Sequence, residues 1–116
     1  MKSLLDEFIP VEEEAVDIYD EPGSKTMSER IERLKSYCLK NWQQGKKQFS
    51  DAASWHFSPE LEKVRKDLVK YCKLEERKAD LLIKFYSRPY EDYNDEMNKA
   101  NQELESVTTK IWRDLQ

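Results

Sequence analysis

Two stretches of the sequence, residues 60–88 and 90–116, contain neither glycine nor proline. These two residue types most often end a helix or turn the chain, and folds built from strands need them frequently. The whole chain of 116 residues has only two glycines and four prolines. We therefore predict an all-α protein built from long helices.

The first helix is predicted to begin near Thr26. Thr26 and Glu29 stand at the spacing of a capping box, in which the side chains satisfy free backbone N–H groups. Apolar residues then repeat at helical intervals: Ile31, Leu34, Cys38 and Trp42. Gly45 either ends this helix or only weakens it, so the sequence leaves open whether residues 46–56 continue it.

Two further helices follow. Ser58-Pro59 marks a start, because serine caps free N–H groups and proline suits the first helical position. After Pro89, apolar residues repeat every seven positions in the manner of a coiled-coil seam. These are Tyr90, Met97, Leu104 and Ile111, with Tyr93, Ala100 and Val107 between them. We expect an elongated three-helix antiparallel bundle, made of a long αα-hairpin with the first helix packed along it.

The N-terminal segment looks different from the rest. Residues 1–23 contain one base and eight acids, and they include Pro10 and a Pro22-Gly23 turn signal. High charge with few regularly spaced apolar residues is typical of disorder. We therefore divide the chain into an acidic flexible tail, residues 1–25, and a helical bundle domain, residues 26–116, and we expect the tail to be dispensable for folding.

Two short motifs in this tail predict partner binding. Phe8 and Val11, with acids on both sides, resemble the acidic-aromatic-x-x-aliphatic motif that autophagy receptors add as a strand to ubiquitin-like modifiers. Tyr19 and Pro22 are similar to the tyrosine-phosphorylation sites that Src-homology adaptor modules read. These resemblances imply that Phe8, Val11, Tyr19 and Pro22 contact a protein partner.

The predicted second helix also carries a basic stripe. At about 100° per residue, six bases fall within an arc of roughly 80°, opposite the apolar face. They are Lys63, Lys66, Lys70, Lys73, Arg77 and Lys84. The stripe is either an ordinary solvated face or a site for an acidic protein segment, nucleic acid or an anionic membrane. We expect the acidic tail to visit the stripe of its own chain or of a neighbouring copy.

The residues that catalysis requires are scarce. The single histidine, His56, lies between two aromatic residues, and the two cysteines, Cys38 and Cys72, have no neighbouring ligand at metal-binding spacing. We predict no enzyme activity, no catalytic residue, no cofactor and no metal. Cysteines that lie far apart with no CxxC pair, and a charged start to the chain, favour a cytoplasmic location.

The function predicted from sequence is that of a non-catalytic adaptor or scaffold. Helix surfaces bind a protein partner, and the acidic tail recruits or regulates. The alternative is an accessory factor that associates with nucleic acid or an anionic membrane through the basic stripe. A homo-oligomer formed through the helix surfaces is also left open.

Overall fold

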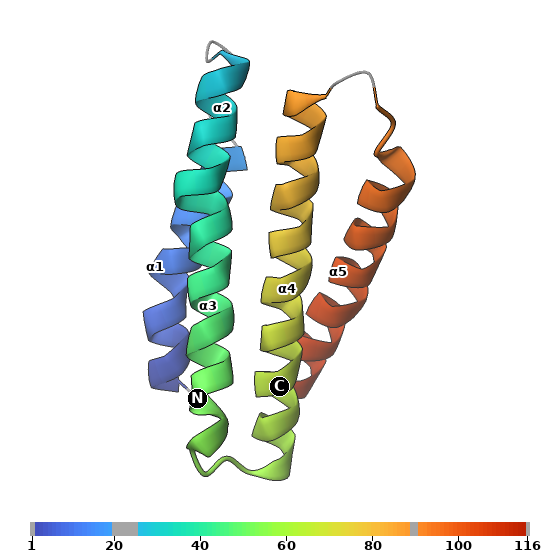
Figure 1. The fold of residues 1–116 in the computed structure, drawn as a ribbon. Helices are drawn as coiled ribbons and strands as arrows, with labels where there is room; N and C mark the ends of the chain where they lie inside the picture. The colour runs from blue at the N-terminus through green and yellow to red at the C-terminus, as the bar shows by residue number, and fades with distance from the viewer. Residues whose placement is uncertain (1, 20–25, 89–90, 116) are drawn as a thin grey trace.

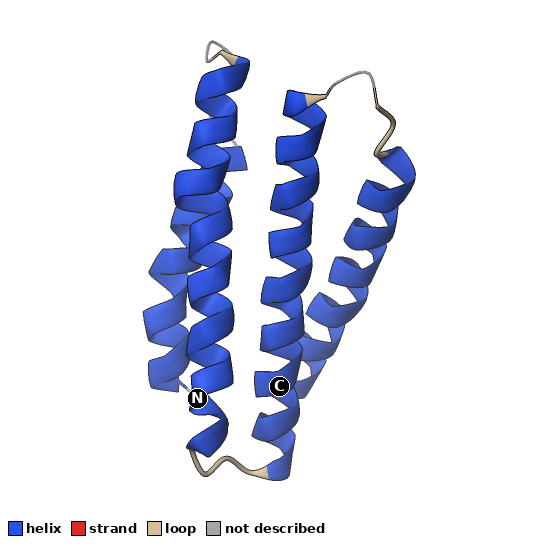
Figure 2. Cartoon of the chain, viewed as in Figure 1, coloured by secondary structure: helices blue, strands red, loops and turns tan. Residues whose placement is uncertain are grey.

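The computed structural model describes residues 2–19, 26–88 and 91–115, and within these ranges every regular element is a helix (Figure 1, Figure 2). The elements are α1 (Lys2–Tyr19), α2 (Met27–Arg33), a π-helix η1 (Leu34–Leu39), α3 (Lys40–Asp51), a 3-10 turn η2 (Ala52–Ser54), α4 (Pro59–Ser87) and α5 (Asn94–Leu115). The all-α prediction is confirmed for these residues.

The segments α2, η1 and α3 form one uninterrupted helical rod (Figure 1). At its start, the Thr26 hydroxyl accepts a hydrogen bond from the Glu29 backbone N–H at 3.2 Å, which confirms the predicted cap. Helical backbone angles persist through both internal junctions. The first helix therefore passes Gly45 and residues 46–51 continue it, whereas residues 52–54 form the 3-10 turn and residues 55–56 lie beyond it.

The central element of the fold is α4. Its cap is also as predicted, because the Ser58 hydroxyl accepts a hydrogen bond from the Leu61 N–H at 3.3 Å and Pro59 occupies the first turn. The rod packs on one side of α4 and α5 packs on another, while α1 packs against the rod. Consecutive rods alternate in direction, as Figure 1 shows, and the molecule measures 47 × 26 × 21 Å.

The predicted seam of the last helix is present from Ala100 onward, while Met97 is half-buried and Tyr93 precedes the helix. Its buried residues recur at intervals of three and four positions, as in a heptad repeat: Ala100, Leu104, Val107 and Ile111. The helix starts at Asn94, later than Pro89, and the Asn94 N–H donates to the Asp92 carboxylate at 2.9 Å. Tyr90, the first residue of the predicted repeat, lies outside the described residues.

Residues 2–19 differ from the prediction of a flexible tail. They form α1, which packs against η1 and α3, so the described chain has four helical rods and not three. Four of its side chains join the same buried cluster as residues of α3, α4 and α5: Leu4, Phe8, Ala15 and Ile18. Five of the six acids of α1 are exposed, and Glu12 is half-buried. A strongly negative outer face is compatible with an ordered helix when the apolar face has a partner.

The close approach of α1 to α3 depends on Gly45. The Phe8 ring lies with its centroid 4.8 Å from that of Phe49 and 6.3 Å from that of Trp42. A Cβ atom at position 45 would stand 3.1 Å from Phe8 Cε2 and 3.2 Å from Cys72 Sγ, which is closer than ordinary contact. Gly45 therefore provides the space that Phe8 occupies.

Pro10 lies inside α1 without ending it. Proline lacks the N–H that would bond to the carbonyl four residues earlier. Both Pro10 and Asp6 are exposed, so water can take the place of this donor. A polar contact also holds α1, because the buried Asn41 side-chain amide on α3 donates to the Val11 carbonyl at 3.1 Å.

Candidate functional site

All six residues of the basic stripe are exposed on α4. Lys84 forms an ion pair with Asp80, with Nζ 3.1 Å from Oδ2. Within the described part of the chain the other five form no ion pair, and we call them the basic face: Lys63, Lys66, Lys70, Lys73 and Arg77. They follow one another at intervals of three and four residues and extend over about 21 Å of helix at the usual rise.

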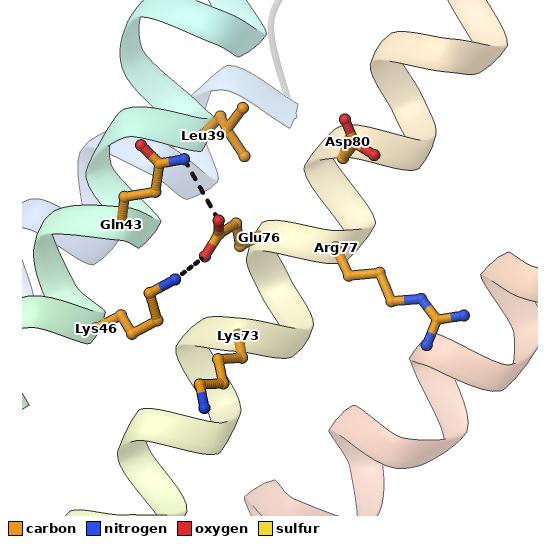
Figure 3. Close-up of a pocket in the computed structure, with 7 residues that line it drawn as sticks. All are labelled: Leu39, Gln43, Lys46, Lys73, Glu76, Arg77 and Asp80. Atoms are coloured by element: carbon orange, nitrogen blue, oxygen red, sulfur yellow. Dashed lines mark hydrogen bonds and ion pairs between the residues drawn. The ribbon is translucent and has the colours of Figure 1, made fainter. Parts of the chain in front are cut away.

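A surface pocket of about 520 Å³ lies between α3 and α4 beside part of the basic face (Figure 3). In it, Lys46 Nζ lies 2.7 Å from one oxygen of Glu76, and Gln43 Nε2 donates to the other at 3.3 Å. Lys73 and Arg77 extend from α4 away from this carboxylate (Figure 3). The pocket thus presents Lys73 and Arg77 beside Glu76. The charge of Glu76 is already balanced by Lys46 of α3.

A smaller pocket of about 210 Å³ lies between α4 and α5 at the other end of the basic face. Lys110 Nζ lies 3.6 Å from Asp67 Oδ1 across the two helices, and Arg113 Nε lies 3.4 Å from Asp114 Oδ1. The remaining residues that line this pocket are Lys63 and Lys66. Positive charge therefore exceeds negative charge in both pockets.

The surroundings of Lys84 are different. It lines a third pocket, of about 430 Å³, with Glu91 of the segment that leads into α5 and Glu96 of the first turn of α5. Arg88, at the end of α4, lies 3.7 Å from Glu91. The structure thus brings five of the six stripe residues together as an open cationic surface and places Lys84 among acids.

The tail residues predicted to bind a protein partner lie in α1, except for Pro22, which lies outside the described residues. Phe8 is only 3% exposed and Val11 is half-buried. Binding of this motif as an added strand would require α1 to leave the core. Tyr19 is the last residue of α1, and its side chain, like Pro22, lies outside the described residues. The binding roles of Tyr19 and Pro22 stay predictions.

Three cations beside the basic face were not identified from the sequence. Lys46 reaches it from α3, and Lys110 and Arg113 reach it from α5. Lys46 is one of three lysines on α3, and Lys110 and Arg113 lie three residues apart on α5, but no spacing within either helix relates them to α4. Only the packing of the three helices brings these side chains next to the stripe.

Tyr71, which is half-buried, and Cys72, which is buried, are neighbouring weak acids on α4. Burial raises the pKa of both groups, and the negative charge of Glu12 on α1 adds to the effect. The Tyr71 ring packs edge-on against Trp42, with centroids 5.6 Å apart. A thiol held protonated is a poor nucleophile, so Cys72 has the character of a core residue.

We expect these two groups to make stability decrease in alkali. Their ordinary pKa values are 9.0 for Cys72 and 10.0 for Tyr71. Since folding raises both, the unfolded chain loses these protons first. Their contribution to stability is complete below about pH 9 and declines as pH rises further, by up to about 1.4 kcal/mol per pH unit for each group. Urea unfolding between about pH 8 and 11 measures this decline, and Tyr71→Phe should make it shallower. An equal slope in the variant would contradict the assignment.

Within the described ranges, no group of three or more His, Cys, Asp or Glu side chains is placed to hold a metal ion. None of the helices described is both long enough and apolar enough to cross a membrane. Comparisons with protein-family models, curated proteins and solved structures found no match for this chain. Function is therefore inferred from the basic face and the side chains around it.

Proposed function

We propose that this chain is a non-catalytic protein-interaction domain, of the adaptor or scaffold kind, whose basic face binds an acidic helical segment of a partner protein. The main support is the run of five exposed cations on the central helix, none of them ion-paired within the described residues. Uncompensated charge on a rigid helix attracts an acidic ligand and orients it.

The spacing of the basic face favours a helical ligand. Its residues alternate between intervals of three and four, which is the spacing that keeps side chains on one side of a helix. A partner helix with acids at the same intervals can lie along α4 and pair with several cations at once. The half-buried Leu39, which lines the pocket of Figure 3, adds an apolar contact beside the charges.

Acids within the same surface argue against nucleic acid and anionic membranes. Asp67 and Asp114 line one pocket, and Glu76 and Asp80 line the other, where they would repel phosphates. In addition, α4 has α3 and α5 packed beside it, and the DNA major groove is only about 12 Å wide, enough for a single helix. A protein segment can place its acids opposite the five cations and other residues opposite these acids, which a uniformly charged polyanion cannot do.

The proposal is tested with a synthetic helical peptide that carries glutamates at alternating three- and four-residue intervals. Fluorescence anisotropy measures its binding to the wild-type chain and to the double variant Lys70→Glu/Lys73→Glu. Reversal turns attraction into repulsion at two positions, so we expect affinity to fall by roughly tenfold or more, about 1–2 kcal/mol. Binding should also weaken as salt is raised.

The matched control is Lys40→Glu/Lys47→Glu, two exposed positions on α3 outside the three pockets described above. It makes the same change in net charge and should retain the wild-type affinity. A peptide of equal composition with its glutamates placed all around the helix should bind more weakly. Equal loss in both double variants, or tighter binding of duplex DNA than of the peptide, would contradict the proposal.

A further inference from the structure

The outward side of α1 carries negative charge that has no ion-pair partner in the described structure. Five of its acids are exposed and form no ion pair with any described residue: Asp6, Glu7, Glu13, Glu14 and Asp17. We call them the acidic face. Glu12, by contrast, is half-buried and helps to raise the pKa of Tyr71 on α4. The chain therefore presents an acidic helix and a basic helix, each with its charges exposed.

The two faces do not meet within one molecule. The main packing partners of α1 are η1 and α3, and it lies behind the rod in Figure 1. The residues that line the two pockets along the basic face come from η1, α3, α4 and α5, and none comes from α1. A packed α1 consequently cannot bind the basic face of its own chain.

We infer that the acidic helical segment bound by the basic face is α1 of a second copy of this chain. This inference rests on the proposed function and names its partner. From Asp6 to Asp17 the acidic face extends over about 17 Å, compared with about 21 Å for the basic face. Asp6, Glu13 and Asp17 are separated by seven and four residues, which matches the register of Lys66, Lys73 and Arg77. The acidic face and the basic face thus have similar lengths, matching residue spacing and opposite charge.

Contacts of this kind join two different surfaces and are therefore heterologous. After one contact forms, the first copy still has a free acidic face and the second has a free basic face. Such contacts continue into open chains of molecules unless the rotation between copies closes a ring. Exposed ion pairs are weak individually and are screened by salt. We expect reversible association that grows with protein concentration at low salt.

The test is sedimentation velocity on the full chain over a range of concentrations. The wild-type sedimentation coefficient should rise with concentration at low salt and become constant in about 1 M salt, where the Debye length is about 3 Å. Lys70→Glu/Lys73→Glu alone should abolish the rise, and so should Glu13→Lys/Asp17→Lys alone. Circular dichroism spectra of both variants should match that of the wild type, since all four positions are exposed.

Mixing the two variants provides the decisive observation. The reversed basic face of one then meets the reversed acidic face of the other, so an equimolar mixture should recover the concentration dependence. No rise in the wild type, or no recovery in the mixture, would overturn the inference. If the glutamate peptide still binds the wild-type basic face in that case, the proposed function stands and only the second copy is excluded as the ligand. Loss of both results would overturn both proposals.

Discussion

Replacing Phe8 with alanine is expected to lower the free energy of unfolding by about 3–5 kcal/mol, the usual range for removing a buried phenylalanine side chain. The ring is 3% exposed and packs against Phe49 and Trp42, in the space that Gly45 leaves open. Its removal creates a cavity at the contact between α1 and α3. Urea unfolding followed by circular dichroism measures the change.

The neighbouring residue supplies the control. Ile9 is 46% exposed, and Ile9→Ala should change stability by about 0.5 kcal/mol or less. A flexible tail would make both substitutions equally harmless. Equal stability of Phe8→Ala and the wild type would show that α1 does not pack as the structure describes, and it would restore the view that residues 1–25 are dispensable for folding.

Replacing Leu104 with aspartate is expected to destabilise the protein by more than about 4 kcal/mol, because it introduces an unpaired carboxylate into the contact between α4 and α5. Leu104 is 7% exposed and belongs to the main buried cluster. The chief packing partner of α5 is α4, so the effect should be greatest in α5. Hydrogen exchange should show that amides of residues 94–115 lose protection before those of α3.

Ser106→Asp adds the same charge to an exposed position of the same helix. It should leave both stability and exchange protection close to those of the wild type. The comparison separates the effect of burying a charge from the effect of adding one. If Leu104→Asp kept the wild-type melting curve, the seam assigned to α5 would be wrong.

The helical content of residues 26–115 and two helix starts, at Thr26 and Ser58, could be predicted from the sequence because they depend on neighbours in the chain. The caps at Thr26 and Ser58 act within one turn, and the seam through Leu104 and Ile111 is an interval pattern on a single helix. The basic stripe is of the same kind, since residue spacing alone places its members on one side of α4.

Tertiary contacts determined that residues 2–19 form a packed helix. The apolar positions Leu4, Phe8, Ala15 and Ile18 do have helical spacing, but the acid run and Pro10 outweighed this signal in the sequence. A short helix of this composition gains most of its stability from packing, so local propensity does not show whether it forms. The deciding contact, Phe8 beside Gly45, joins residues far apart in the chain.

Tertiary packing also determined which cations lie beside the basic face. Lys46, Lys110 and Arg113 come from α3 and α5, and their positions beside α4 follow from which helices pack together. Side-chain spacing along a helix is set by covalent geometry and hydrogen bonds within a turn or two. The choice of which apolar faces meet depends on burial and shape complementarity between distant segments, and no local interval in the sequence records it.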